Sequence, residues 1–265
     1  MAIWDQVQPD RKVALLEDLE QLDEVDTLVD VFDLFKILLA DPDPRIRAIS
    51  LRVLGESEDP SLIQPIINIL ETDRDEVVRS NAASVLGQFI YLGELDELSI
   101  SKLHLVEAAL LNSFRTDKQS LVRRRSLESL GFSSLPEVQD LISKACQLDI
   151  ADWQSTALFA MSRSANDDWI PTILEKFDSP YPEVQKEAIR AAGELESTEA
   201  RSAITELLEE GIEDYELRMT AIWALSKIGG EGIQTLFDKL IDDAVDEDEI
   251  EFIEEALENL SLTQT

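Results

Sequence analysis

A short sequence pattern recurs six times in this chain of 265 residues. Each copy begins with a large hydrophobic residue followed by Arg or Gln, has a small residue at its fifth position, and closes on a dipeptide such as Leu-Gly. The copies close at Gly55, Gly87, Gly131, Ser162, Gly193 and Ser226. A spacing of about 31 residues, with one longer gap, predicts a repeat protein in which similar units stack in a row.

Each copy has the pattern of an amphipathic helix. In the second copy Val78, Ala82, Val85 and Leu86 fall at helical spacing and form one apolar stripe. After the first copy, a polar linker at 56–60 leads to another apolar stripe at 62–70. Each repeat is therefore predicted to be a hairpin of two helices, with the recurring pattern as its second helix.

Small residues at the fifth position of each copy predict close helix packing. They are Ser50, Ala82, Ser126, Ala157, Ala188 and Ala221. Because a small side chain lets two helices approach closely, a bulky residue at this position is expected to disrupt the stacking. The glycines that close four of the copies suit a left-handed helix end, so we expect the second helices to stop there.

The repeats do not extend to the ends of the chain. We expect a single solenoid over residues 1–265, with N-terminal cap helices at 1–40, repeats at 41–241 and a C-terminal cap helix at 242–265. The last segment has no Lys or Arg but keeps a helical stripe that includes Ile253, Ala256 and Leu260. Terminal units of repeat proteins are atypical because one of their faces meets water.

The charge balance limits the partners of the chain. Lys and Arg number 23 against 56 Asp and Glu, which gives a net charge of −33. Such a surface repels phosphate backbones and anionic membranes, so we expect neither a nucleic acid nor a membrane as partner. A protein with a basic surface fits this charge, although a surface adapted for solubility or for high salt would carry the same charge.

The expected localisation and the expected lack of a catalytic site both follow from motifs that the sequence does not contain. The N-terminal residues carry no basic leader and no apolar run reaches membrane-spanning length, so we expect a cytoplasmic protein. The single cysteine, Cys146, lies in an apolar run and is expected to be buried. His104 is the only histidine, and no nucleophile motif or phosphate loop is present. We therefore expect no catalytic residue, metal or cofactor; the sequence favours a role other than catalysis but leaves enzyme activity open.

The repeats resemble HEAT repeats of the short bacterial type that also occurs in phycobilin lyase subunits. The resemblance covers residues 40–241 and is carried best by Asp75, Val78, Arg79, Ala82, Leu86 and Gly87. It implies an all-α, right-handed α-α superhelix of about six helical hairpins with helical caps. It also implies a structural ladder of acid–base pairs between neighbouring repeats, formed here by Asp43, Arg47, Asp75, Arg79, Asp214 and Arg218. Gln154 and Gln185 replace the arginine in two copies, so the ladder is expected to be interrupted there.

A candidate binding surface follows from the geometry of such arrays, whose second helices line a concave face. The position two residues before the closing dipeptide points outward, and it holds Phe159, Arg190 and Trp223 in the last three copies. Aromatic residues and arginine dominate binding hot spots, so we expect these three to contact a partner. Arg124 and Lys186 occupy another outward column and add positive charge. The longer gap, 91–101, is a second candidate docking element, or else an ordinary surface loop.

The function expected from these features is a non-catalytic scaffold or adaptor that binds a partner protein on its concave face. Two alternatives stay open. The resemblance to phycobilin lyases implies a bilin lyase or a chromophore-detaching factor, and a structural protein that associates with itself is the other alternative. The sequence does not assign an oligomeric state.

Overall fold

The computed structural model describes residues 4–25, 31–244 and 246–263. These described residues form α-helices and short 3-10 helices, and they contain no strand. The predicted caps lie partly outside them, at residues 1–3, 26–30, 245 and 264–265. The α-helices are α1 (Pro9–Val25), α2 (Phe32–Leu38), α3 (Pro44–Val53), α4 (Ile63–Thr72), α5 (Glu76–Glu94), α6 (Ile100–Thr116), α7 (Ser120–Leu130), α8 (Pro136–Cys146), α9 (Ala151–Arg163), α10 (Ile170–Glu175), α11 (Pro182–Glu194), α12 (Arg201–Glu210), α13 (Tyr215–Ile228), α14 (Ile233–Asp243) and α15 (Glu247–Thr263).

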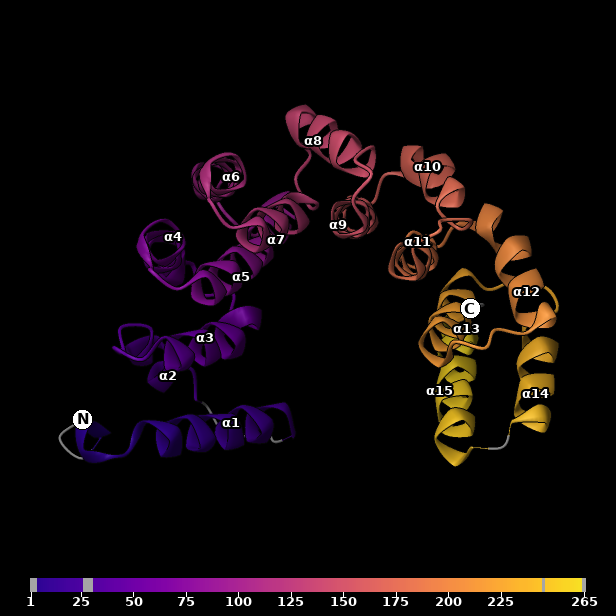
Figure 1. Ribbon diagram of the computed structural model, residues 1–265, viewed down its shortest axis with the longest axis horizontal. Coiled ribbons are helices and arrows are strands. Elements are labelled where there is room, and N and C mark those ends of the chain that lie inside the picture. Colours follow the sequence, from indigo (N-terminus) through magenta and orange to yellow (C-terminus); the bar gives the residue numbers. More distant parts are fainter. Residues whose placement is uncertain (1–3, 26–30, 245, 264–265) are drawn as a thin grey trace. The chain divides into compact units, whose positions relative to one another are not determined.

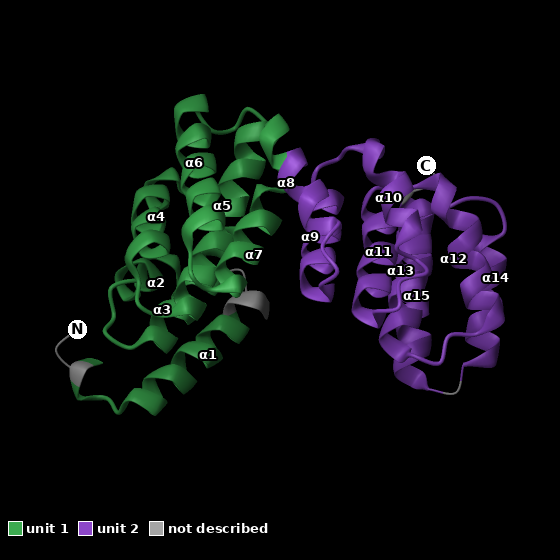
Figure 2. Ribbon diagram, turned by 45° about the horizontal axis from the view of Figure 1, so that its top comes forward, with its two compact units in different colours: residues 1–138 green, residues 139–265 purple. Residues whose placement is uncertain are grey.

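Two compact units divide the chain, residues 1–138 and residues 139–265 (Figure 2). In the first unit α2 pairs with α3, α4 with α5 and α6 with α7, while α1 packs on α3. In the second unit α10 pairs with α11, α12 with α13 and α14 with α15. The helix α8 begins in the first unit and continues into the second. The predicted division of a single domain into caps and repeats stays a prediction.

Each unit has two layers of helices. In the second unit α9, α11, α13 and α15 pack side by side, and α10, α12 and α14 cover one side of them (Figure 1). In the first unit α3, α5 and α7 form the corresponding layer. We call this layer of second helices the second-helix layer, because it contains the recurring sequence pattern.

The small residues at the fifth position lie where these helices meet. All six, from Ser50 to Ala221, have no exposed surface. The two serines satisfy their hydroxyl groups within the helix: Ser50 donates to the carbonyl of Ile46 at 2.8 Å and Ser126 donates to that of Val122 at 2.9 Å. A buried hydroxyl with a partner costs little, which explains how serine replaces alanine here.

Two glycines of the repeat, Gly87 and Gly193, have a different role from the expected left-handed helix end. Gly87 and Gly193 lie inside α5 and α11, and neither has a positive φ. A Cβ atom at Gly193 would lie 2.7 Å from the Cα atom of Ala224, and one at Gly87 would lie 3.0 Å from the Cβ atom of Ser129. These glycines therefore permit close approach of neighbouring second helices, since they add no side chain at the contact.

Aspartates begin several of the second helices. Asp43, Asp75 and Asp214 are the N-caps of α3, α5 and α13. The carboxylate of Asp75 accepts hydrogen bonds from the backbone N–H groups of Val77 at 2.9 Å and of Val78 at 3.1 Å. Such caps satisfy N–H groups that have no partner within the helix, so they fix where each second helix starts.

An ion-pair ladder runs through the first unit, but its acids are not the capping aspartates. Arg47 donates to both carboxylate oxygens of Asp73, at 2.7 and 2.8 Å. Arg79 donates in the same way to Asp117, at 2.8 and 3.0 Å, and also to the carbonyl of Asp73 at 2.9 Å. Each arginine thus joins its own repeat to the following one. In the second unit Arg218 pairs with Glu249 of α15 at 2.7 Å.

The two acids of the ladder are stabilised in their charged form. Burial acts to raise the pKa of Asp73 and of Asp117, but hydrogen bonds from the arginines and from backbone N–H groups outweigh it. The pKa of each carboxyl therefore lies below its ordinary value. At the two copies that carry glutamine, Gln154 donates to the carbonyl of Leu148 and Gln185 to that of Phe177, both at 2.7 Å. There the side chain ties down only its own repeat.

The longer gap in the repeat does not form a long loop. The extra residues lengthen α5 and α6, which end at Glu94 and begin at Ile100, so only residues 95–99 connect them. Near the C-terminal end of α5, the aromatic rings of Tyr91 and Phe132 pack against each other, with their centroids 5.3 Å apart. Ile100 remains 63% exposed.

Helix α15 packs as a second helix. Its buried residues Ile253, Ala256 and Leu260 lie on one stripe, and the helix contacts both α13 and its hairpin partner α14. The acidic segment at the C-terminus therefore extends the second-helix layer beyond α13. This extension forms one wall of the groove described next.

Candidate functional site

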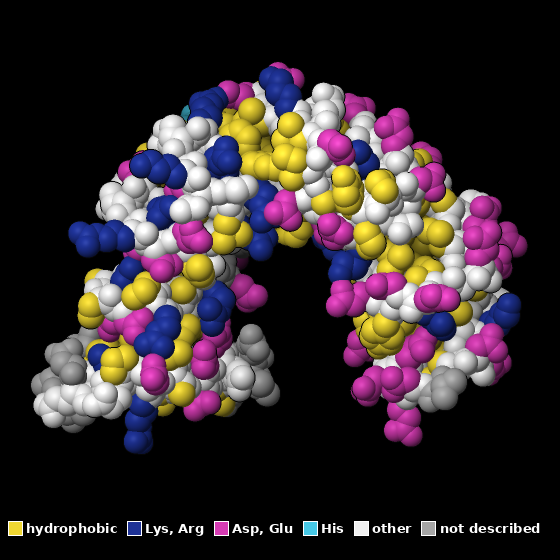
Figure 3. Space-filling model, in the orientation of Figure 1, with side chains coloured by type: hydrophobic (Ala, Val, Ile, Leu, Met, Phe, Trp, Pro, Cys, Tyr) yellow, Lys and Arg dark blue, Asp and Glu magenta, His cyan; other side chains and the backbone are white. Residues whose placement is uncertain are grey.

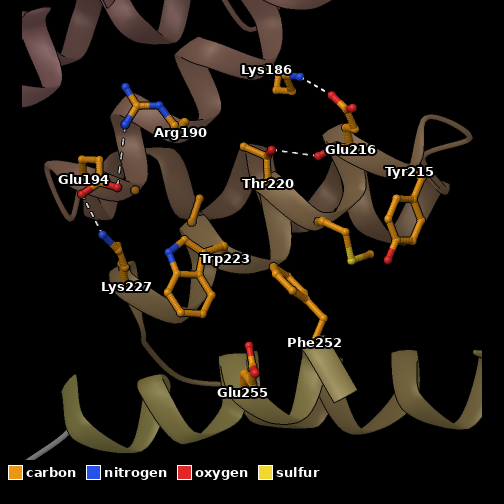
Figure 4. A pocket seen from close by; sticks show the side chains of 13 residues that line it. Lys186, Arg190, Glu194, Tyr215, Glu216, Thr220, Trp223, Lys227, Phe252 and Glu255 are labelled. Atoms are coloured by element: carbon orange, nitrogen blue, oxygen red, sulfur yellow. Dashed lines mark hydrogen bonds and ion pairs between the residues drawn. The ribbon is translucent and has the colours of Figure 1, made fainter. Parts of the chain in front are cut away.

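A groove of about 620 Å³ opens on the second-helix layer of the second unit. Side chains of α11, α13 and α15 line it, and all of them belong to residues 139–265. Its apolar surface comes from Gly193, Tyr215, Met219, Trp223, Ala224 and Phe252. We call it the α13 groove, because α13 contributes the most residues (Figure 4).

Helical spacing on α13 places the central residues of the groove. Tyr215, Met219, Trp223 and Lys227 follow one another at intervals of four, so they share one face of the helix. Phe252 approaches from α15, and its ring centroid lies 5.9 Å from that of Trp223, at an interplanar angle of 49°. This is a favourable tilted arrangement of two aromatic rings. Tyr215 at the end of the row is 51% exposed.

Charged residues surround the apolar surface, and the basic ones already have acidic partners. Lys227 lies 2.7 Å from Glu194, and Lys186 pairs with Glu216. Arg190 donates through Nε to both oxygens of Glu187 at 3.1 Å, and its Nη1 atom lies 3.8 Å from Glu194. The wall formed by α15 contributes Glu255, which is exposed.

Phe159 lies beside the groove and not in its lining. Its ring is covered by two guanidinium groups, with the Cζ atom of Arg163 at 4.3 Å from the centroid and that of Arg190 at 4.6 Å. Arg190 also donates to the hydroxyl of Ser162 at 3.2 Å. Cation–π contacts of this kind orient an arginine side chain, so Phe159 and Ser162 position Arg190 at the edge of the groove.

The structure brings together most of the residues that the sequence nominated. Arg190, Trp223 and Lys186 line the α13 groove, and Phe159 supports Arg190. Arg124 belongs to α7 in the first unit and is not part of this groove. Sequence reasoning missed Met219 and Lys227, although steps of four residues from Trp223 lead to both. It also missed Phe252, because α15 was treated as a cap with a charged outer face.

The side chains of the α13 groove define the chemistry available to it. The residues lining it include no histidine or cysteine, and its ionisable side chains are Lys, Arg, Glu and Tyr. Cys146 is buried, and burial raises the pKa of its thiol. Among the described residues no group of three or more His, Cys, Asp or Glu side chains is placed to hold a metal ion.

One buried carboxyl lies elsewhere, in the first unit. Glu107 on α6 is 3% exposed and accepts a hydrogen bond of 2.5 Å from the hydroxyl of Ser133. Burial raises the pKa of this carboxyl, and the hydrogen bond from Ser133 acts in the opposite direction. The contact ties α6 to the segment that precedes α8. His104, on the same helix, is exposed.

None of the helices in the described part of the chain combines the length and apolar character needed to span a membrane. The stacked hairpins, with a groove on the layer of second helices, define an α-helical repeat protein. The model of the HEAT repeat family matches residues 32–104 and 170–258, which together are more than half of the chain. The chain therefore belongs to the HEAT repeat family.

Two solved structures resemble the chain over most of its length. YibA of Escherichia coli is 19% identical with a TM-score of 0.50, covering 96% of this chain and 98% of that one. One chain in the structure of the complex of CpcE and CpcF of phycocyanin lyase from Nostoc sp. PCC7120 is 20% identical with a TM-score of 0.54, and the match covers 88% of this chain and 95% of that chain. At these identities the likeness shows the fold alone. No curated protein sequence matches the chain.

Proposed function

We propose that this HEAT repeat protein is a non-catalytic adaptor that binds a partner protein through the α13 groove. The observation that carries the proposal is the row of Tyr215, Met219 and Trp223, joined by Phe252, on the second-helix layer. Partly exposed aromatic residues in a depression, with an arginine beside them, are typical of binding hot spots. The second-helix layer is also the surface that stacked repeats use for recognition.

The groove is suited to an anchoring side chain. A volume of about 620 Å³ is enough for one or two large side chains of a partner, and it also falls in the range of small-molecule sites. The three basic residues of the groove are engaged by Glu187, Glu194 and Glu216, so an anionic small molecule would have to displace those acids. A neutral or basic protein segment can bind without displacing these glutamates. For this reason we favour a protein partner.

Substitutions in the groove test the proposal. Trp223→Ala and Tyr215→Ser are each expected to weaken partner binding at least tenfold, because hot-spot residues bury large surfaces against a partner. The measurement is affinity capture from the native cell, followed by titration of the captured partner against each folded variant. Ile100→Ser serves as the control, since Ile100 is 63% exposed but lies in the first unit at the α5–α6 connection. This control is expected to bind like the wild type.

Two results would contradict the proposal. Loss of the partner from Ile100→Ser, with retention by both groove variants, would assign binding to the α5–α6 connection. Equal binding by all variants would exclude the α13 groove as the docking surface. Circular dichroism and a thermal melt of each variant separate lost binding from lost folding.

A bilin lyase or chromophore-detaching factor remains the alternative of a different class, favoured by the fold likeness to the CpcE–CpcF complex. Mixing the chain with a free phycobilin and recording the absorbance spectrum separates the two functions. A red shift that Trp223→Ala abolishes would support the bilin alternative, whereas we expect no shift. Self-association is the third alternative, and light scattering across concentration and salt detects it.

A further inference from the structure

We propose that the α13 groove takes a basic segment of another protein, in which a large apolar side chain enters the groove and Lys or Arg side chains face α15. This inference rests on the function proposed above and names the chemistry of the partner. It follows from the charges beside the groove, from the net charge of the second unit and from the apolar surface inside the groove.

The wall formed by α11 and α13 has little free charge. Lys186 is engaged by Glu216 and Lys227 by Glu194, so these charges cancel within the wall. Arg190 is engaged by both Glu187 and Glu194. A partner therefore meets no unmatched positive charge on this side, and an acidic segment gains no ion pair without breaking one that exists.

The charged residues on the exposed face of α15, beside the groove, are all acidic. Glu251, Glu254, Glu255 and Glu258 are exposed and follow the spacing of one helix face. Within the described residues no Lys or Arg lies within ion-pair distance of these four, whereas the neighbouring Glu249 pairs with Arg218. Glu255 lines the groove itself, and Figure 4 shows it rising from α15 toward the aromatic rings. A basic side chain of a partner would find its counter-charge here.

The net negative charge of the second unit also favours a basic partner. Residues 139–265 contain nine Lys and Arg against thirty Asp and Glu. Figure 3 shows acidic side chains around the apolar surface over α13 and α15. This charge repels a second copy of the chain, a nucleic acid and an anionic membrane, while it speeds the approach of a basic protein.

The apolar residues at the bottom of the groove, which we call its floor, would bind an apolar side chain of the partner. Trp223, Phe252 and Met219 offer a surface of aromatic and thioether groups, which adapts to a large aliphatic or aromatic side chain. A segment that alternates such an anchor with Lys or Arg at helical spacing would satisfy the floor and the α15 wall together. This pattern is the mode of an amphipathic helix lying in a groove.

Three fluorescein-labelled synthetic peptides test the inference by anisotropy at about 0.15 M salt. The first is an amphipathic helix with leucine on one face and lysine on the other, the second replaces lysine by glutamate, and the third keeps the lysines but moves the leucines out of helical phase. We expect only the first to bind the full chain. Its affinity should fall at least tenfold in Trp223→Ala and in Tyr215→Ser, because both remove part of the apolar surface.

A pair of matched charge variants separates recognition from general attraction. Glu251→Gln/Glu255→Gln/Glu258→Gln removes three exposed carboxylates of α15, including Glu255 in the groove lining. The matched variant, Glu206→Gln/Glu209→Gln/Glu210→Gln, removes three exposed carboxylates of α12 in the same unit. The α15 variant is expected to bind the lysine peptide about tenfold more weakly, and the α12 variant within twofold of the wild type. Equal weakening by both would overturn the inference, because binding would then follow net charge alone.

The remaining outcomes distinguish the inference from the proposed function. If the glutamate peptide binds and the lysine peptide does not, and Trp223→Ala abolishes that binding, the groove is a docking site and the basic partner is wrong. If none of the peptides binds, or if binding does not depend on Trp223 and Tyr215, both the inference and the docking role of the groove fail.

Discussion

Replacing Gly193 with leucine is expected to lower the free energy of unfolding by about 3 kcal/mol, because the new side chain has no room where α11 crosses α13. Even a Cβ atom at this position would lie 2.7 Å from the Cα atom of Ala224 and 2.8 Å from its Cβ atom. The obstacle is backbone, so the two helices must move apart and the buried contacts between them loosen. Urea denaturation followed by circular dichroism measures the effect.

Alanine substitutions at two glycines make the matched comparison. Gly193→Ala is expected to destabilise the chain by about 1 kcal/mol, since the steric clash exceeds the gain in helix propensity. Gly55→Ala is expected to be neutral or to stabilise by up to about 1 kcal/mol, because nothing lies within 4 Å of its Cβ position and its φ is not positive. If both variants change stability in the same direction and by the same amount, close helix approach is not the reason for glycine at position 193.

The contrast between these glycines shows what the repeat pattern could predict. Spacing alone identified the second helices, and the small residues at the fifth position are buried between helices as expected. A glycine that closes a helix and a glycine that admits a neighbouring helix have the same sequence signature. Gly87 and Gly193 belong to the second kind, and only the position of the next repeat, at Ser129 and Ala224 respectively, distinguishes the two.

The ladder was predictable for its basic residues and not for its acids. The resemblance implied that each arginine pairs with an aspartate of a neighbouring repeat, and the aspartates expected for this role stand four positions before the arginines, as Asp75 does before Arg79. In the structure that aspartate is a helix cap, and the arginine reaches an acid in the following repeat. The carboxylate of Asp75 accepts from the backbone N–H groups of Val77 and Val78 at the start of its helix. The partner of Arg79 is 38 residues away, at Asp117.

The groove was predictable in part, for a related reason. Arg190, Trp223 and Lys186 were found because each lies at an outward position of a second helix. Phe252 was not, because the acidic composition of α15 obscured its role as another second helix. The longer gap at 91–101 shows the reverse problem, since its residues read as a loop but lengthen α5 and α6. Hydrophobic spacing shows that a helix exists but does not identify the helix against which it packs.

Replacing Arg79 with methionine is expected to lower the free energy of unfolding by about 3 kcal/mol at neutral pH, because it leaves the carboxylate of Asp117 buried without its partner. The side chains of Arg79 and Asp117 are only 13% and 11% exposed, and the pair is joined by two hydrogen bonds. Arg45→Met is the matched control. Arg45 also pairs with aspartates but is half-exposed, so its loss is expected to have little effect.

The dependence on pH follows from the lowered pKa of Asp117. A carboxyl whose pKa is lower in the folded state than in the unfolded state contributes its full stabilisation above the unfolded value, about 3.9, and loses it as pH falls through the folded value. The difference in stability between the wild type and Arg79→Met should therefore be constant from pH 7 to about pH 5 and should shrink below about pH 4. Urea denaturation at a series of pH values measures this difference. A difference that persists unchanged at pH 3 would mean that Arg79 stabilises the chain through its packing and its bond to the carbonyl of Asp73, and not through the charge of Asp117.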